Sequence, residues 1–377
     1  MSIRRTIITI AMISPLIFGA TTQLDLTDAF DNQLAAKDYG ADYSIMIEGG
    51  FSYHDGFVHY WNASTGYSKL DVSTGDITVV GKPENINSNG YGDPFGAYDS
   101  ENGYFYGATC DAMSDGYLYK YDESTEQWTE EGSAVNFYGG QVYNGELYFS
   151  GLNEPWNGSV GQTTFISRFV PDSPHTYNDI EGGLQLHDSL IETAGNSAHM
   201  AIDKDGNFYY AVYNSGDLGL YKWTSSQVET VIDDIANDEI DEYLTLEDGE
   251  KLTDLPGGAN GLTVDDGGHV FVTVNNSSYL MMWNGTSGDG DNYTILGESS
   301  AAYGWFGGLA IEGDFTKGDA LYGSYNFYGP ITAIAIPACV NRPSMDANGD
   351  CRVSIDDFAT FASQWLTDGL EYKMDME

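Results

Sequence analysis

Short runs in which apolar and polar residues alternate recur along most of the chain, and Gly, Asn, Asp and Ser separate them. The clearest example is the segment 95–132. It contains four such runs, at 95–98, 104–108, 117–121 and 127–130. Alternation with a period of two predicts β-strands, and the Asn-Gly dipeptide between the first two runs is typical of a tight hairpin. The segment is therefore predicted to form a four-stranded antiparallel sheet.

The hairpin glycine of this segment marks a repeat. Glycines in similar contexts recur with 42 to 62 residues from one to the next: Gly56, Gly103, Gly145, Gly206, Gly268 and Gly318. Repeated four-stranded sheets bury their faces by packing on one another, and a closed ring of them leaves no exposed end. The predicted fold is an all-β, six-bladed β-propeller. Seven blades, or a β-sandwich or solenoid, are the alternatives.

Two copies of the unit need separate interpretation. The fourth, at 218–232, is predicted to contain a strand, a tight turn and a further strand. The last copy ends at 331–337 and lacks a fourth strand. In closed propellers a strand from the other end of the chain fills such a place. The segments 23–27 and 43–47 are the two that we expect to serve.

The repeated unit resembles the kelch-like and NHL-like propeller superfamilies. The resemblance lies in an apolar strand, an Asp/Asn-Gly turn, an aromatic strand and then a run such as LYKYD at 118–122. It implies the fold. Because the diagnostic signatures of these superfamilies are missing, it implies no activity.

The first 22 residues have the layout of a secretory signal peptide. Arg4 and Arg5 precede an apolar run at 6–20, and small residues follow at 19–22. A membrane anchor is disfavoured, since Ser14 and Pro15 interrupt the run and it is shorter than the roughly 20 apolar residues of a spanning helix. We expect a secreted or cell-surface protein with no membrane insertion after cleavage, and a propeller domain over 23–337.

The charge balance narrows the partners. The chain has 14 Lys and Arg against 57 Asp and Glu, a formal net charge of -43. Such a surface repels phosphate backbones, so we expect no nucleic-acid partner. A highly solvated and soluble surface is the favoured interpretation of this charge, and Ca²⁺ binding, cationic partners or a salty medium are the alternatives.

The connections between strands are predicted to differ on the two sides of the ring. Turns from first to second and from third to fourth strand are short. The other connections are long and rich in Asn, Gly, Tyr and Trp: 82–93, 109–116, 151–162, 171–196, 233–257 and 326–329. Binding sites often lie on long loops. Aromatic rings there can stack on sugars while amides bind hydroxyls. The ligand-binding candidates are Trp61, Asn62, Tyr91, Trp156, Asn260 and Trp305; capping of the core between blades is the alternative role of the aromatic residues.

Three histidines, His175, His187 and His199, are predicted to lie on or near the side with long loops. A neutral imidazole beside a Tyr could abstract a proton next to a uronate carboxylate, which makes these three residues the catalytic candidates. Several histidines could instead hold a metal ion, but their spacing matches no fixed ligand pattern. No nucleophile elbow, zinc helix, phosphate loop or dinucleotide fingerprint occurs. The other histidines, His54, His59 and His269, have structural roles available. The acidic segment 233–254 is predicted to be a solvated loop or a short helix.

The sharpest motif lies in the C-terminal segment 338–377. Six residues occupy positions one, three, five, seven, nine and twelve of an EF-hand loop, from which oxygens bind Ca²⁺: Asp346, Asn348, Asp350, Arg352 through its carbonyl, Ser354 and Asp357. A helix with Phe358, Phe361 and Trp365 on one face is predicted to follow. Cys339 and Cys351 flank this acidic region and are predicted to pair, leaving Cys110 free.

This motif resembles a single type I dockerin repeat, over about 30 of the 377 residues. The resemblance implies calcium binding and a cohesin-like or cell-surface partner. Dockerins are duplicated, however, and no second repeat follows here. A calcium-stapled terminal module or a lone attachment tag is therefore the other interpretation. Dockerin-type modules are typically appended to secreted proteins that process polysaccharides.

These observations predict a secreted, calcium-binding propeller that binds or helps to process an extracellular polysaccharide or oligosaccharide. The first alternative is a polysaccharide-degrading enzyme, a glycoside hydrolase or uronate lyase, with its site on the propeller. The second alternative is a non-enzymatic surface protein that serves adhesion or protein interaction. The residues do not rank these three functions.

Overall fold

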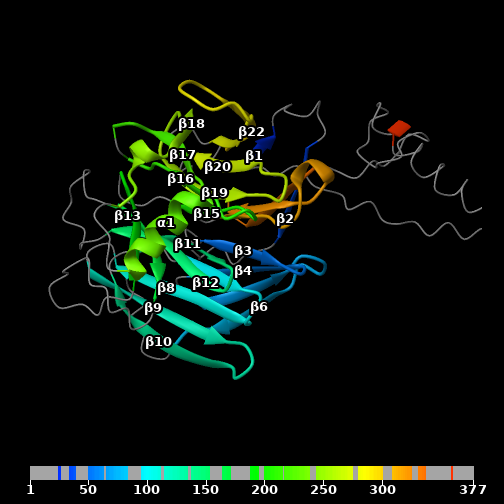
Figure 1. Cartoon of the computed structure of the whole chain (residues 1–377). Coiled ribbons are helices and arrows are strands. Elements are labelled where there is room, and N and C mark those ends of the chain that lie inside the picture. The colour runs from blue at the N-terminus through cyan, green and yellow to red at the C-terminus, as the bar shows by residue number, and fades with distance from the viewer. Residues whose placement is uncertain are drawn as a thin grey trace, which may run out of the picture.

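In a computed structural model the chain folds into six antiparallel sheets arranged around a common axis (Figure 1). The structure describes residues 24–26, 34–39, 50–62, 65–83, 95–111, 114–134, 137–152, 164–170, 187–194, 199–214, 216–237, 243–274, 279–299, 308–324, 330–336 and 358–359. Each sheet has four strands in simple order, and the fifth sheet has one more.

The first three blades follow one another in sequence. The first contains β3 (Phe51–His54), β4 (Phe57–Asn62), β5 (Gly66–Asp71) and β6 (Ile77–Gly81). The second contains β7 (Phe95–Asp99), β8 (Tyr104–Asp111), β9 (Ser114–Asp122) and β10 (Gln127–Ala134). The third contains β11 (Phe137–Tyr143), β12 (Glu146–Leu152), β13 (Thr164–Phe169) and β14 (His187–Thr193). The prediction of a loop at 109–116 is wrong, because β8 and β9 extend through most of this segment.

The other three blades complete the ring. The fourth contains β15 (Met200–Ile202), β16 (Phe208–Ala211), β17 (Gly219–Trp223) and β18 (Glu250–Asp254). The fifth contains β19 (Ala259–Val264), β20 (Val270–Val274), β21 (Tyr279–Trp283), β22 (Tyr293–Ser299) and, at its edge, β1 (Leu24–Leu26). The sixth contains β23 (Leu309–Ala310), β24 (Leu321–Ser324), β25 (Ile331–Ala335) and β2 (Ala35–Tyr39).

The first strand of every blade lies nearest the axis. These inner strands, β3, β7, β11, β15, β19 and β23, contact one another in that order, and β23 contacts β3 again, so the ring is closed. The predicted β-propeller is confirmed, and in the described part of the chain it has six blades.

All six predicted turn glycines lie between the first and second strands of a blade. Each has a positive φ, from 70° at Gly103 to 105° at Gly318. Only glycine adopts this region without steric cost, so one glycine per blade is a backbone requirement of the turn. We call the side of the ring that carries these turns, together with the third-to-fourth connections, the turn face. The opposite side is the loop face.

Ring closure uses a strand from the N-terminal part of the chain, as predicted, but neither predicted segment supplies it. β2 pairs with β25, with Ala35 opposite Ala335 and Tyr39 opposite Ile331. Ala36 and Tyr39 are both buried, and because they are three residues apart in a strand they lie on opposite faces of β2. Ala36 belongs to the buried cluster that contains Phe271 and Leu280 of the fifth blade, and Tyr39 to the cluster that contains Phe51 and Val58 of the first blade. Of the predicted segments, 23–27 includes β1, which pairs with β22 in the fifth blade, and 43–47 lies outside the described residues.

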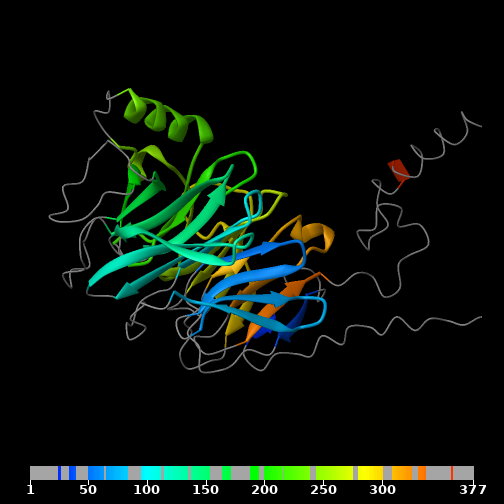
Figure 2. The ribbon, with the colours of Figure 1, turned by 90° about the horizontal axis from the view of Figure 1, so that it is seen from below.

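The fourth blade departs from the predicted pattern. The run predicted to be its last strand belongs to α1 (Ser225–Ala236), and the last strand is β18. Thr224 and Gln227 form a capping box, and Val228, Val231 and Ile235 bury one helical face. Figure 2 shows α1 (green) outside the blade strands, on the turn face. The acidic segment 233–254 thus includes the end of α1, a short 3₁₀ helix η1 (Leu246–Asp248) and β18.

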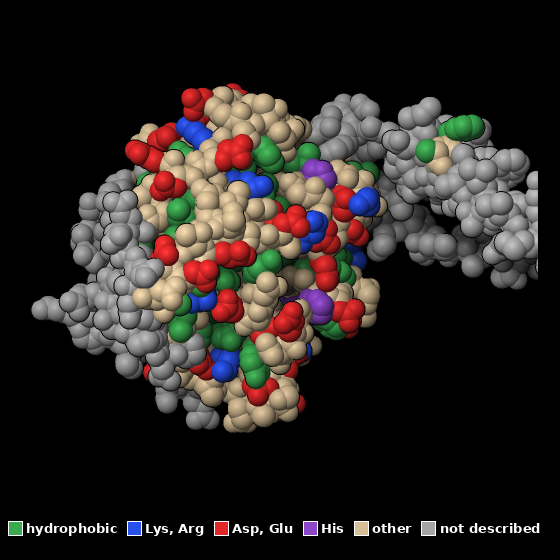
Figure 3. All heavy atoms as spheres, in the orientation of Figure 1, with side chains coloured by type: hydrophobic (Ala, Val, Ile, Leu, Met, Phe, Trp, Pro, Cys, Tyr) green, Lys and Arg blue, Asp and Glu red, His purple; other side chains and the backbone are tan. Residues whose placement is uncertain are grey.

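The described surface carries mostly acidic charge. In Figure 3 acidic side chains are spread over the visible described face, with basic ones among them.

A second 3₁₀ helix, η2 (Phe315–Lys317), lies between β23 and β24. No helix among the described residues is long and apolar enough to cross a membrane.

Candidate functional site

A cavity of about 230 Å³ runs along the axis, and residues of all six inner strands line it. Its exposed lining is mostly polar. Typical sites for drug-sized ligands have volumes of about 300–1,000 Å³, so this channel has room for a small molecule or one end group of a larger ligand.

A histidine lies at the loop-face end of the channel. His199 immediately precedes β15, is 8% exposed and lines the cavity. Gly139 of β11 allows the approach, because a Cβ at that position would lie 3.1 Å from the His199 Cα and 3.3 Å from its Nδ1. Asn260 lies at a bulge near the start of β19, the neighbouring inner strand. The structure therefore brings two predicted site residues to the same end of adjacent inner strands.

At the turn-face end of the channel a histidine contacts a glutamate of the neighbouring blade. His54 Nδ1 lies 3.3 Å from Glu312 Oε1, and the backbone N–H of Asp55 donates to Glu312 Oε2 over 3.2 Å. Gln141, which also lines the channel, bonds both backbone groups of Ile202 and so links the third and fourth blades. These contacts join neighbouring blades, which leaves the loop-face end as the better candidate for ligand binding.

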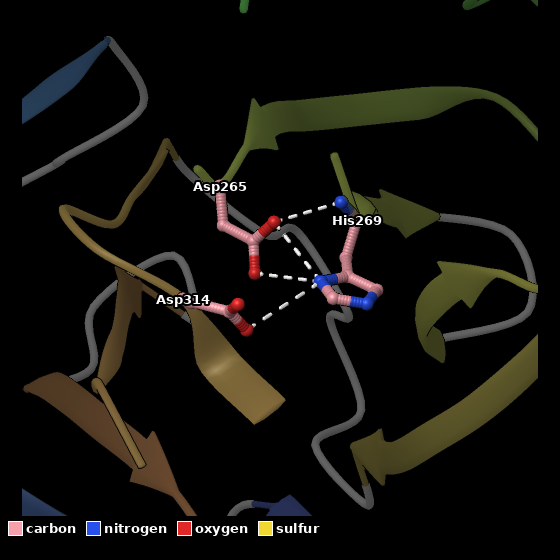
Figure 4. A group of neighbouring side chains, drawn as sticks. All are labelled: Asp265, His269 and Asp314. Carbon is pink, nitrogen blue, oxygen red and sulfur yellow. Dashed lines mark hydrogen bonds and ion pairs between the residues drawn. The ribbon is translucent and has the colours of Figure 1, made fainter. Parts of the chain in front are cut away.

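The described residues contain one group of side chains that could hold a metal ion: Asp265, His269 and Asp314 (Figure 4). Asp265 follows β19 and His269 precedes β20, whereas Asp314 comes from the sixth blade. His269 Nδ1 lies 2.9 Å from Asp265 Oδ2 and 3.9 Å from Asp314 Oδ1. The hydrogen bond to Asp265 raises the pKa of His269 above 6.5. Asp265 Oδ2 also accepts the Phe315 N–H over 2.8 Å, so the group joins two blades.

The fourth blade has an aspartate at the position equivalent to Asp265, and this aspartate stabilises the turn through hydrogen bonds. Asp203 follows β15, and its Oδ1 accepts the N–H groups of Asp205 and Asn207 while its Oδ2 accepts the Asn207 amide. The two turns share their backbone bonds: the aspartate N–H donates to the carbonyl of the fifth turn residue, and the turn glycine donates to the aspartate carbonyl. The fifth blade adds an imidazole and a second carboxylate to this common turn.

Another histidine lies in the junction between the first and second blades. His59 of β4 stacks on Tyr98 of β7, with ring centroids 3.7 Å apart, and its Nδ1 lies 2.7 Å from the Tyr67 hydroxyl. Tyr67 and Tyr98 both donate to the carboxylate of Glu123, over 3.1 and 2.9 Å. Burial lowers the pKa of His59 to about 3, so the ring is neutral. Since Tyr67 donates to Glu123, His59 donates through Nδ1.

Two predicted ligand-binding residues lie in the interior. Trp61 is 2% exposed and packs between Phe105 and Trp128. Asn62 is 1% exposed, and its Oδ1 accepts the N–H of Thr65. A buried ring cannot stack on a sugar, so the prediction for Trp61 and Asn62 is wrong. These residues serve the packing between blades and the β4–β5 turn.

The predicted catalytic histidines are not gathered at one place in the described structure. His187 opens β14, the outermost strand of the third blade. A fourth strand starts at the turn face, so the loop-face position predicted for His187 is wrong. His175, Tyr91, Trp156 and Trp305 lie outside the described residues. So do the calcium-loop residues 346–357 and both cysteines of the predicted disulfide.

Sequence reasoning missed the group formed by Asp265, His269 and Asp314. Asp265 and His269 are four residues apart around a turn glycine, and the same spacing joins Asp203 to Asn207. Comparison of the two turns could have indicated that His269 bonds to Asp265. Nothing in the sequence indicated Asp314, because its approach depends on how two blades pack.

Comparison of the sequence with protein-family models and with curated proteins finds no match. The fold is similar to solved structures. A gluconolactonase from Xanthomonas campestris is 12% identical over 84% of this chain and 96% of that one, with a TM-score of 0.53. An aldose sugar dehydrogenase from Streptomyces coelicolor, in its PQQ-bound form, is 14% identical over 80% of this chain and 98% of that one, with a TM-score of 0.52. At these identities the likeness concerns the fold alone.

Proposed function

We propose that the protein is a secreted β-propeller that binds an extracellular polysaccharide or oligosaccharide at the loop-face mouth of its central channel. The observation that carries the proposal is the polar axial cavity, with His199 at its loop-face end and Asn260 on the adjacent inner strand. Sugars present hydroxyl groups that need paired donors and acceptors, which imidazole and amide groups supply. The cavity volume suits one sugar ring or chain end.

The comparisons support a sugar-type ligand in a limited way. The two solved structures described above are named as a gluconolactonase and an aldose sugar dehydrogenase, and both have this fold. One fold hosts many activities, so the site residues have to decide.

Binding is tested on a glycan array with the mature chain, residues 23–377. We expect bound glycans, and we expect His199→Ala and Asn260→Ala each to weaken their binding at least tenfold. His187→Ala is the matched control, because that residue lies on an outermost strand, and it should bind normally. A folded protein that binds no glycan would contradict the proposal and favour the adhesive or protein-interaction function.

Catalysis is the second candidate, and the burial of His199 at the channel favours it. A histidine held against the neighbouring strand could act as a general base on a substrate that reaches the channel. The array hits are therefore incubated with the protein and assayed for new reducing ends and for unsaturated products. Turnover that His199→Gln abolishes would identify a hydrolase or lyase; binding without turnover would identify a binding protein.

The calcium site is proposed in the C-terminal module. The ligands are Asp346, Asn348, Asp350, Ser354 and Asp357, with the carbonyl of Arg352, at EF-hand spacing. Chelation or Asp346→Ala is expected to speed proteolysis after Cys339, and Asp346→Ala is expected to leave the melting temperature of the propeller unchanged. Tail proteolysis that does not respond to chelator would contradict this proposal. Pull-down with a cohesin domain, with and without Ca²⁺, tests the dockerin-like partner.

A further inference from the structure

The junction between the fifth and sixth blades offers nitrogen and oxygen donors at metal-binding distances. Asp265 is fully buried, Asp314 is 11% exposed and His269 is 29% exposed, so the group is open to solvent on one side only. Figure 4 shows the imidazole beside the two carboxylates, with its Nδ1 turned toward both. Ligands that lie about 2.0–2.2 Å from one ion are roughly 3–3.5 Å from each other. The distances of 2.9 and 3.9 Å from His269 Nδ1 to the two carboxylates bracket this range.

Hydrogen bonds already orient both carboxylates. The backbone N–H groups of His269 and Phe315 donate to Asp265 over 2.7 and 2.8 Å. Thr316 donates to Asp314 Oδ1 through its N–H and its hydroxyl, over 3.0 and 2.6 Å. Such bonds to the ligating side chains are usual around metal sites, where they fix ligand geometry.

Gly267 gives the imidazole and the second carboxylate room to approach each other. Its φ is not positive, unlike that of the adjacent Gly268 at 82°, so the backbone does not require glycine there. Glycine is required by the lack of space: a Cβ at residue 267 would lie 2.7 Å from His269 Nδ1 and 3.0 Å from the Asp314 carboxyl carbon. The glycine keeps the position beside the donor atoms empty.

The turn of the fourth blade shows what the turn alone needs. There Asn207 takes the place of His269 and bonds to Asp203 through its amide, which cannot serve as a comparable metal ligand. Imidazole and a second carboxylate are therefore additions that the turn geometry does not explain.

We infer that Asp265, His269 through Nδ1, and Asp314 bind a first-row divalent transition-metal ion such as Zn²⁺ at the junction of the fifth and sixth blades. Imidazole nitrogen with carboxylate oxygen suits these ions better than Ca²⁺, which prefers oxygen alone. The ion takes the Nδ1 lone pair, the ring keeps its hydrogen on Nε2, and a doubly protonated ring releases one proton to solvent. Lys317, whose ammonium lies 2.8 Å from Asp314 Oδ2, is 78% exposed and free to turn outward.

The ion would act where the ring closes. The sixth blade contains β2, the strand from the N-terminal part of the chain, so a metal ion held by both blades stabilises the closing blade against its neighbour. Binding that is restricted to the folded state raises the melting temperature.

The test uses the mature chain without an affinity tag, treated with chelator and then dialysed. Titration calorimetry with Zn²⁺, Mn²⁺ and Ca²⁺ is compared between the wild type, His269→Asn and Asp314→Asn. We expect one Zn²⁺ site whose affinity falls at least tenfold in both variants, and a wild-type melting temperature that Zn²⁺ raises by several degrees. His269→Asn copies the turn of the fourth blade, so folding is expected to persist and is checked by circular dichroism.

Two glycine variants complete the test. Gly267→Ala is expected to weaken Zn²⁺ binding at least tenfold, because its Cβ displaces the imidazole. Gly268→Ala is the matched control: a Cβ there has no neighbour within 4 Å, so it strains the turn without filling the site. Zn²⁺ binding that is equal in the wild type and in His269→Asn would overturn the inference, as would equal effects of the two glycine variants.

Discussion

His59 and His269 each lie at a junction between two blades, and their pKa values are shifted in opposite directions. His59, between the first and second blades, is 4% exposed and stacks on Tyr98, and burial lowers its pKa to about 3. His269, between the fifth and sixth blades, is partly exposed, and its bond to Asp265 raises its pKa. Desolvation dominates at the first site and a carboxylate partner at the second.

One repeated fold therefore supports two kinds of junction. The first is held by aromatic packing around a neutral ring, with Glu123 fully engaged by Tyr67, Tyr98 and Lys69. The second is held by charge and remains open to solvent. Only the second has the donor set for a metal ion, and it lies where the ring closes.

Removal of the central carboxylate should have the largest effect. Asp265→Ala leaves His269 and the Phe315 N–H without their buried partner, and we expect a loss of about 3–5 kcal/mol in the free energy of unfolding. Glu123→Ala should cost less, about 1–3 kcal/mol, because that side chain is 27% exposed. Urea denaturation measures both. Asp205→Ala, at an exposed carboxylate, is the control and should change stability by less than about 0.5 kcal/mol. A larger loss of stability in Glu123→Ala than in Asp265→Ala would contradict the difference between the two junctions.

Replacing one glycine by alanine in each junction should have the next largest effect on stability. A Cβ at Gly107 would lie 2.5 Å from the buried Trp61 ring, so Gly107→Ala is expected to cost about 2–3 kcal/mol. Gly268→Ala meets no atom within 4 Å and strains only a φ of 82°, for about 1 kcal/mol. Thermal and urea unfolding measure the difference. Equal costs would show that the first junction is not closely packed.

Acid should weaken the first junction. Because the folded pKa of His59 is about 3 and the ordinary value is 6.5, the unfolded chain binds a proton between these pH values that the folded chain does not. Stability therefore falls as pH falls below 6.5, by about 1.4 kcal/mol per pH unit at most, or about 2 kcal/mol by pH 5. Urea denaturation between pH 7.5 and 5 checks this, with His59→Gln as the variant that should lose the slope. A wild-type slope that persists in His59→Gln would have another origin.

The second junction should respond to pH in the opposite sense and more weakly. The raised pKa of His269 means that its charge stabilises the fold below pH 6.5, and that this contribution is lost as pH rises through the folded pKa. We expect about 1 kcal/mol or less, since the ring is partly exposed. The measurement is the stability of the wild type minus that of His269→Asn from pH 6 to 9, in metal-free buffer. A difference that does not change with pH would contradict the assignment.

The propeller could be predicted because its signals are local. Each positive-φ glycine and the alternating run after it depend on a few adjacent residues, so the six turns follow from the spacing of Gly56, Gly103 and their equivalents, and six blades were favoured over seven. Where local signals were ambiguous the prediction failed. The run after Trp223 fits a strand by composition, but Val228, Val231 and Ile235 at helical spacing form the buried face of α1.

The positions of the candidate site residues could not be predicted as well, because they depend on contacts between residues far apart in the sequence. Trp61 fits an exposed platform as well as a core, and only its packing against Phe105 of the next blade decided the matter. The ring-closing strand was found at Ala35–Tyr39 rather than at either predicted segment, since many short runs can pair with an edge strand.

The repeating unit, the turn positions and a surface dominated by negative charge follow from the sequence, because short-range pattern or composition sets all of them. The choice of six blades over seven depended on the closure of the ring, which β23 and β3 make in the structure. The tertiary structure alone decided which histidine is neutral and which carries charge. His269 meets Asp314 only because the fifth blade packs against the sixth, and His59 loses its charge only because Tyr98 of the second blade covers it. A protonation state depends on desolvation and on neighbouring charges, and both are set by packing between blades.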